Sequence, residues 1–195
     1  MTNSTSRIEV HWNYLLAIEN DLEKLSRYVE FDERNFDCFS VEIARILLSA
    51  SAEADVVCKK LCLKFNQSSS ADNIHRYRDE IKTAHPNIVD FEVIISRYGL
   101  SLRPWDKWKD SQGVPDWWTA YNKVKHHRET EYHRANLKNA IDSVAGLFVM
   151  TLYFYQEKAN SGKLNPVPQI LRVNAEYFKG IFHGGNDWSF IYRIV

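Results

Sequence analysis

A short stretch in the second half of the chain gathers the side chains that could do chemistry. It reads Trp117-Trp118-Thr119-Ala120-Tyr121-Asn122-Lys123-Val124-Lys125-His126-His127-Arg128 and contains two adjacent imidazoles among Lys and Arg, with no acidic residue from Lys123 onward. Imidazoles exchange protons near neutral pH, and Lys and Arg bind phosphate oxygens through charge-assisted hydrogen bonds. The stretch therefore predicts a site for an anion or a phosphate.

Helical spacing would place the polar side chains of this stretch on one face. Asn122 and His126 are four residues apart, so a helix brings them together, with Lys125 alongside. Lys125 and Arg128 favour the neutral imidazole of His126, which makes it a better base. The alternative interpretation is structural: His126 caps a helix end or binds a core carbonyl, while the cations form a solvated face.

The spacing Tyr121-Asn122-x-x-x-His126 resembles the motif of the HEPN superfamily. HEPN proteins are all-helical bundles marked by an Arg, a polar residue that is often Asn, and a His after four to six intervening positions. Tyr121 stands where the Arg belongs in that motif. The resemblance covers residues 8–158 and extends to the form YNxxKHxR, which is found in bacterial helical proteins grouped loosely with HEPN, some of them among defence genes.

The resemblance implies a homodimer without cofactor or metal, and two alternative functions. In the first, the protein is an RNA-binding, metal-independent endoribonuclease of a defence or toxin–antitoxin system. His126 then transfers the proton, Asn122 orients it or the phosphate, and Lys125 or Arg128 replaces the missing Arg. In the second, the protein is a non-catalytic dimeric module that binds a protein, such as an antitoxin, or another anionic ligand. The expected substrate-binding side chains are Tyr121, Lys123 and His127.

Three other interpretations of these residues are weaker. A later register places Arg128 and His133 around four residues, but with Glu129 where Asn is usual. A zinc site could use His126, His127, Glu129 and His133, although the H-E-x-x-H spacing is absent. The Trp cluster could stack on unpaired bases, but large aromatic residues more often lock a loop against a bundle.

Composition limits the classes of protein that the chain can belong to. Its 195 residues fit one domain with a small appendage, and 25 Lys and Arg balance 25 Asp and Glu, so any contact with nucleic acid must be local. From Arg103 to Lys138, eight cations face five acids. Cys38, Cys58 and Cys62 do not form a disulfide framework, and Cys58 and Cys62 suit a helical core. Without a signal core after Met1 or an apolar run long enough for a bilayer, we expect a soluble, cytoplasmic protein.

The periodicity predicts an all-α, HEPN-like up-and-down bundle over residues 8–158, followed by an arm or β-hairpin over 159–195. In the second helix, Ser51 and Asp55 interrupt an apolar stripe near Glu53. This part of the helix either meets something polar, or the stripe shifts to Ala52 and Val56 and leaves both acids in water. The expected helices span 8–31, 41–65, 72–84, 88–98, 116–127 and 134–155, and the expected strands span 170–173 and 188–195.

Overall fold

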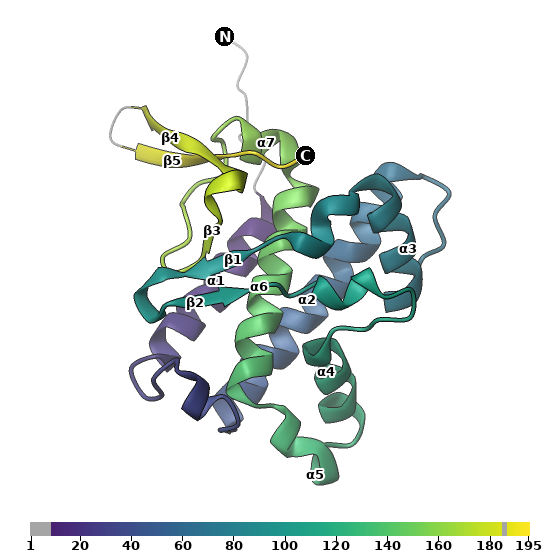
Figure 1. The fold of residues 1–195 in the computed structure, drawn as a ribbon, viewed down its shortest axis with the longest axis vertical. Helices are drawn as coiled ribbons and strands as arrows, with labels where there is room; N and C mark the ends of the chain where they lie inside the picture. Colours follow the sequence, from purple (N-terminus) through teal and green to yellow (C-terminus); the bar gives the residue numbers. More distant parts are fainter. Residues whose placement is uncertain (1–8, 185–186) are drawn as a thin grey trace.

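The computed structural model describes residues 9–184 and 187–195, and most of these are helical. Figure 1 shows α6 running through the middle of the molecule, with strands β1 and β2 across its front and α3, α4 and α5 to one side. The helices are α1 (Val10–Leu25), α2 (Val41–Phe65), α3 (Ile74–Ala84), α4 (Asp116–His126), α5 (Arg128–Glu131), α6 (Leu137–Phe154) and α7 (Gln156–Asn160). The strands are β1 (Val93–Ile95), β2 (Leu100–Leu102), β3 (Arg172–Val173), β4 (Phe178–Gly184) and β5 (Asp187–Tyr192).

The core forms where α6 packs along α2, and α1 packs against both of these helices. One face of α6 is apolar at the helical period and is therefore expected to point inward, and its residues are all fully buried: Leu137, Ile141, Val144, Phe148 and Leu152. Burial of this many aliphatic and aromatic side chains is the main source of stability in the fold. No helix among the described residues is both long enough and apolar enough to cross a membrane.

Helix α2 begins where the sequence predicts, because the Ser40 side chain accepts a hydrogen bond from the Ile43 amide and caps the helix. The buried stripe was only partly predicted. Cys58 and Cys62 lie in the core as expected, but Val41 is 73% exposed. Burial raises the pKa of the Cys62 thiol to about 12, so this thiol stays protonated.

In the polar interruption of α2, the two acids have polar neighbours, whereas the buried Ser51 hydroxyl has no hydrogen-bond partner among the described residues. The stripe does not shift to Ala52 and Val56, both of which are exposed. Ser51 is fully buried, and the Glu53 carboxylate lies 2.5 Å from His11 Nδ1 on α1. Burial raises the pKa of Tyr77 on α3, and the carboxylate of Asp55 beside its hydroxyl raises it further. These two acids therefore join α2 to its neighbours.

Two of the expected helices differ in the structure. The first ends at Leu25 rather than Phe31, because the Ser26 hydroxyl binds the Glu23 carbonyl at 2.6 Å and the chain then turns. Its expected first residue, Ile8, and the Met1–Arg7 segment lie outside the described residues.

The helix expected over residues 88–98 is wrong. The chain forms a 3-10 turn over Pro86–Asp90 and then β1, in which Val93 and Ile95 point into the core and Ile94 does not. β-branched side chains suit this alternating, half-buried surface. The mainly helical fold therefore includes a sheet with the antiparallel order β2-β1-β3.

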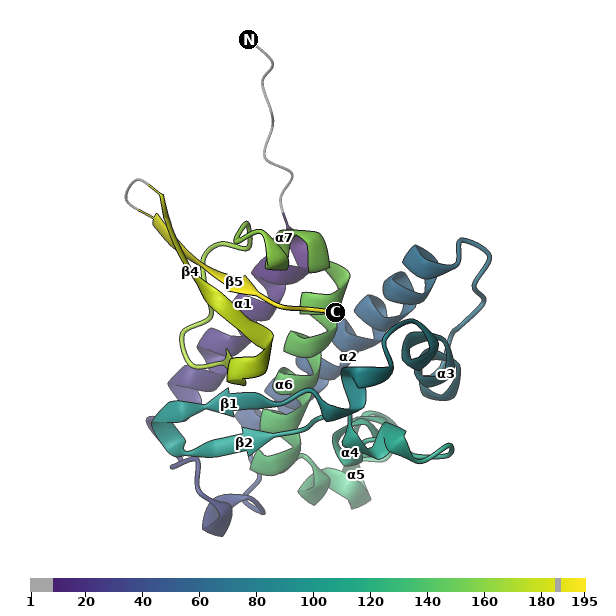
Figure 2. The same cartoon turned by 45° about the horizontal axis from the view of Figure 1, so that its top comes forward.

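A carboxy-terminal hairpin is present, but its strands differ from those expected. Segment 170–173 contributes β3, which pairs with β1 so that Val93 faces Val173. The hairpin partner of β5 is β4, a segment that was not predicted as a strand. Figure 2 shows the hairpin projecting beside α7, at the end of the molecule away from α5.

Candidate functional site

The predicted site lies on α4, a helix that one buried face fixes in place. Trp117, Trp118 and Val124 are buried on that face, and Trp117 Nε1 donates to the Pro104 carbonyl at 3.0 Å. A Cβ at Gly146 on α6 would lie 2.7 Å from the ring of Trp117, so only glycine allows the two helices to approach this closely. The exposed face of α4 is therefore presented on a rigid support.

The Trp cluster next to α4 is part of the core. The ring centroids of Trp105 and Trp108 lie 4.3 Å apart, and Trp117 meets Trp105 edge-on at 5.1 Å. These three residues and Trp118 are almost fully buried. They cannot stack on unpaired bases without unfolding this region. The packing interpretation of the Trp residues is confirmed.

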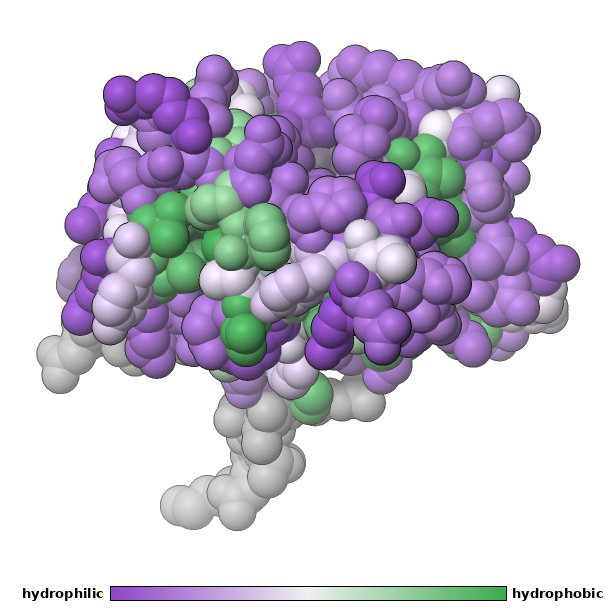
Figure 3. Space-filling model, turned by 90° about the horizontal axis from the view of Figure 1, so that it is seen from below, coloured by the Kyte–Doolittle hydropathy of each residue, from purple (hydrophilic) through white to green (hydrophobic). Residues whose placement is uncertain are grey.

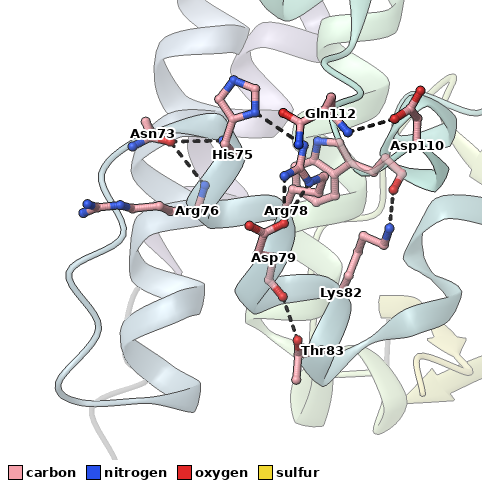
Figure 4. A network of polar contacts seen from close by, with 10 residues as sticks. Asn73, His75, Arg76, Arg78, Asp79, Lys82, Thr83, Asp110 and Gln112 are labelled. Atoms are coloured by element: carbon pink, nitrogen blue, oxygen red, sulfur yellow. Dashed lines mark hydrogen bonds and ion pairs between the residues drawn. The ribbon is translucent and has the colours of Figure 1, made fainter.

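Polar contacts from α3 hold the irregular segment that contains Trp105 and Trp108, as Figure 4 shows. Lys82 donates to the main-chain carbonyl of Trp108, and the Gln112 amide donates to Asp110 at 2.8 Å, which closes the turn after it. The Arg78 side chain is almost completely buried and binds Asp79 through Nε at 2.9 Å. These contacts serve the fold and lie outside the predicted motif.

Tyr121, at the position of the motif's Arg, points toward the core. Its side chain is only 8% exposed, and its ring lies 6.3 Å from that of Trp118. Lys125, one turn later, extends back over it: the ammonium lies 5.4 Å from the ring centroid and 3.4 Å from the hydroxyl. The first position of the motif is thus occupied by a buried ring with a cation above it.

Asn122 and His126 lie on the exposed side of α4, as their spacing predicts. The Asn122 amide donates to the Trp118 carbonyl at 3.2 Å, which leaves its side-chain oxygen as a free acceptor. Among the described residues, none forms a hydrogen bond with the His126 ring. Its imidazole is accessible, but within one copy of the chain no partner orients it as a base.

The cations around His126 are exposed and unneutralised. Lys123, Lys125 and Arg128 form no ion pair with any described carboxylate, whereas nearby Glu131 binds Arg134. That hydrogen bond lowers the pKa of Glu131, and the charges of Arg134 and Lys123 lower it further. The cations also lie near the carboxy-terminal end of α4, where positive charge stabilises the helix dipole.

The basic stretch that begins at Lys123 leaves α4 at His127. Its amide donates to the Lys123 carbonyl at 2.7 Å, and its own carbonyl accepts from Glu131 at 2.9 Å, so α5 starts in a new direction. The rings of His126 and His127 are 6.5 Å apart and tilted by 59°. Glu129 and His133 are exposed, and the described residues include no group of three or more His, Cys, Asp or Glu placed to hold a metal.

An exposed aromatic residue beside this site was not predicted. Phe39, before α2, is 50% exposed, and its ring meets Tyr132 edge-on at 5.5 Å. The backbone here is fixed, since the Leu137 amide donates to the Cys38 carbonyl at 2.9 Å. Figure 3, which views this end of the molecule, shows apolar patches surrounded by hydrophilic side chains. The sequence signal for this exposed residue is that Phe39 is directly before Ser40, which caps α2.

The site that results is an exposed, cationic surface at the end of α4 and the start of α5. Asn122, Lys123, Lys125 and His126 of α4 are exposed there, and so is Arg128 at the start of α5, whereas Tyr121 turns inward. We call these five exposed residues the α4 surface. The acids Glu53 and Asp55 do not belong to it, because they bind His11 and adjoin Tyr77. Such a surface can bind phosphate groups directly. Comparison of the chain with family models, curated proteins and solved structures finds no match.

Proposed function

We propose that this chain is a HEPN-like RNA-binding protein whose α4 surface binds the phosphate backbone. The observation that carries the proposal is the set of three exposed cations, Lys123, Lys125 and Arg128, which no described carboxylate neutralises. When such cations bind backbone phosphates, they displace the counterions condensed on the RNA. The release of these counterions gives affinity without any base contact. Because the charge of the whole chain is balanced, such binding depends on local groups of cations like this one.

We further propose that two copies of the chain combine their α4 surfaces to cleave RNA without metal. The His126 imidazole of one copy takes the proton of a ribose 2′-hydroxyl, the 2′-oxygen attacks the adjacent phosphorus, and the 5′-oxygen leaves with a proton from the second imidazole. The products are a 2′,3′-cyclic phosphate and a 5′-hydroxyl. Two features support a composite site: His126 lacks an orienting partner in one copy, and Lys125 lies where the motif has its Arg.

A second function is favoured by the burial of Tyr121. Because no guanidinium occupies that position, the same surface would serve as a non-catalytic dimeric module that holds an anionic ligand or an antitoxin-like protein. Both proposals place a ligand on the α4 surface; they differ in whether that ligand is RNA that is cleaved, or an anion or a protein that is only bound.

The deciding experiment incubates purified protein in EDTA with a pool of structured RNAs and analyses the new ends. Cleavage that yields 2′,3′-cyclic phosphates in wild type and is lost in His126→Ala supports the nuclease. The matched control is His183→Ala, which removes an exposed imidazole from the distant hairpin and should cleave normally. Retained cleavage in His126→Ala rejects this mechanism. Binding without cleavage supports the module, and absence of RNA binding rejects RNA as the ligand.

A further inference from the structure

The loop that leads into β3 is held from both sides by two charged residues. The buried carboxylate of Glu19 accepts hydrogen bonds from the amides of residues 169, 170 and 171, at 2.9, 2.7 and 3.0 Å. From the other side, the Arg172 guanidinium donates to the carbonyls of Pro168 and Leu171, both at 2.8 Å, and of Gln169 at 3.1 Å. Both side chains are therefore fixed before any ligand arrives.

Arg172 keeps unused binding capacity. A guanidinium has five N–H donors, and the three carbonyls take one each, which leaves the Nε–H and one N–H of Nη2. Arg172 forms no ion pair with any carboxylate in the described chain. A rigid guanidinium with free donors and no ion pair suits a phosphate or a carboxylate.

On one side of Arg172 lies a hollow of about 330 Å³ with aromatic walls. Phe178 and Phe190 meet there edge-on, with centroids 5.6 Å apart, and the Arg172 guanidinium lies 5.1 Å above the Phe190 ring. Tyr192 is buried beneath them. Flat aromatic walls beside a cation are suited to a planar, electron-rich ring. The remaining walls are Val173 and Ala175.

On the other side of Arg172 lies a second hollow, also of about 330 Å³, with polar walls. It contains Ser96 and Arg97 from the turn between β1 and β2, and Glu23 from α1. Arg97 is well exposed and only loosely paired with Glu23, at 3.8 Å. Since Arg172 lines both hollows, an aromatic compartment and a cationic compartment adjoin across one side chain.

We infer that these adjoining hollows bind a nucleotide. The base lies in the aromatic hollow and stacks on the partly exposed ring of Phe178, to which the buried ring of Phe190 is nearly perpendicular. The phosphate binds Arg97 and the free donors of Arg172. Glu23 is placed at the polar side, where a carboxylate can accept hydrogen bonds from ribose hydroxyls. Each hollow falls at the small end of the range for ligand sites, and together they match a ligand with an aromatic part and an anionic part.

This inference does not depend on RNA binding at α4. The hairpin and the β1–β2 turn lie away from α5 in both ribbon views (Figures 1 and 2). The nucleotide can be free or part of an RNA chain, because both present the same base, ribose and phosphate. The experiment below separates these two sources.

The test measures binding of the four ribonucleoside 5′-monophosphates, the matching nucleosides and inorganic phosphate by calorimetry. We expect a nucleotide to bind at least tenfold more tightly than its nucleoside or phosphate alone. Arg97→Ala should weaken nucleotide binding at least tenfold and leave nucleoside binding unchanged, whereas Phe178→Leu should weaken both. Lys179→Ala, which removes an exposed cation next to Phe178, is the matched control and should bind as wild type.

Competition with a short single-stranded RNA identifies the source of the nucleotide. The Lys125→Ala/Arg128→Ala variant lacks two cations of the α4 surface. Displacement of the bound nucleotide by RNA in this variant indicates a nucleotide within an RNA chain, and failure to displace it indicates a free nucleotide. The inference is overturned if folded wild-type protein binds no nucleotide at millimolar concentration. It is also overturned if Arg97→Ala and Phe178→Leu bind nucleotide as wild type does. Neither result affects RNA binding at α4, which the EDTA incubation tests separately.

Discussion

The ammonium of Lys125 lies over the ring of Tyr121, 5.4 Å from its centroid, so the charge of an exposed lysine covers the buried tyrosine one turn before it. The long aliphatic stem of Lys125 lets its charge reach that position from the next turn of the helix. Under the proposed HEPN-like function, Lys125 would supply the cation that the motif of that superfamily takes from its first residue.

Removing cations from α4 should change the salt dependence of RNA binding. For Lys125→Ala and Arg128→Ala, we expect weaker binding of all RNA sequences and a fall of about one in the slope of log K against log salt for each cation lost. Fluorescence anisotropy between 50 and 300 mM salt, roughly the range in which counterion release is measured, gives this slope. Lys179→Ala on the hairpin should keep the wild-type slope, and an unchanged slope in the α4 variants would place the RNA elsewhere.

The composite active site predicts that cleavage depends on association of two copies. Because no described residue orients His126 within one copy, the proposed dimer should lose activity per chain on dilution below its dissociation constant. Sedimentation velocity and cleavage assays over the same concentration series would show the two falling together. Full activity in a range where the protein sediments as a monomer contradicts the composite site.

Glu19 should be among the most sensitive polar positions for stability. Glu19→Ala leaves the amides of residues 169–171 without their acceptor in the interior, and we expect a loss of about 3–5 kcal/mol in the free energy of unfolding. Urea unfolding followed by circular dichroism measures this loss. Glu33→Ala, at an exposed site, should change stability by no more than about 0.5 kcal/mol.

The close approach of α4 to α6 can be tested at Gly146. Gly146→Ala places a methyl group 2.7 Å from the Trp117 ring, and overpacking of this kind costs about 1–3 kcal/mol. The ring carbon in question belongs to the six-membered part of the indole, which Trp117→Phe removes. In a double-mutant cycle, the pair should therefore be more stable than the sum of the single changes predicts. Strict additivity would show that the two side chains do not meet.

His85 should make stability depend on pH. Burial lowers its pKa, although a hydrogen bond with the Val195 carbonyl at 3.2 Å opposes the shift. The unfolded chain therefore binds a proton more readily than the folded chain. This contribution to stability is complete above the ordinary pKa of about 6.5 and is lost as the pH falls through the lower, folded value.

Replacing His85 should reveal that contribution. We expect His85→Phe to lose less stability than wild type between about pH 7 and pH 5, the window that starts at the ordinary histidine pKa. The exposed His183→Gln serves as the control and should follow the wild-type curve in thermal unfolding. Parallel curves for all three proteins would exclude His85 as the titrating group.

The parts of the fold that the sequence predicts well are those set by local patterns. The stripe of α6 repeats with the helical period, and Ser40 marks the start of α2 through a hydrogen bond three residues away. β1 was missed because Val93-Ile94-Ile95 is a short apolar run, which fits a helix as well as a strand. β1 also pairs with β3, where Val93 faces Val173, and no local signal specifies a pairing over such a distance in the chain.

The same distinction applies to the candidate site. Helical spacing correctly placed Asn122 and His126 on one side of α4, because it depends only on residues within the helix. The inward orientation of Tyr121 depends on how α4 packs beside Trp118 and the core, so spacing alone could not give it. The hollows around Arg172 combine residues from α1, β1–β2 and the hairpin, and they exist only in the folded chain.

The pairing of β1 with β3 also affects how the protein can be divided. A chain cut after residue 158 would keep every long helix but lose β3, so that β1 would present an open edge to solvent. The same cut would leave Glu19 as a buried carboxylate without its three amide donors. Open strand edges pair with strands from other molecules, so such a helical fragment should self-associate. In the whole chain, β3 occupies that edge of β1 and thereby protects the protein from aggregation.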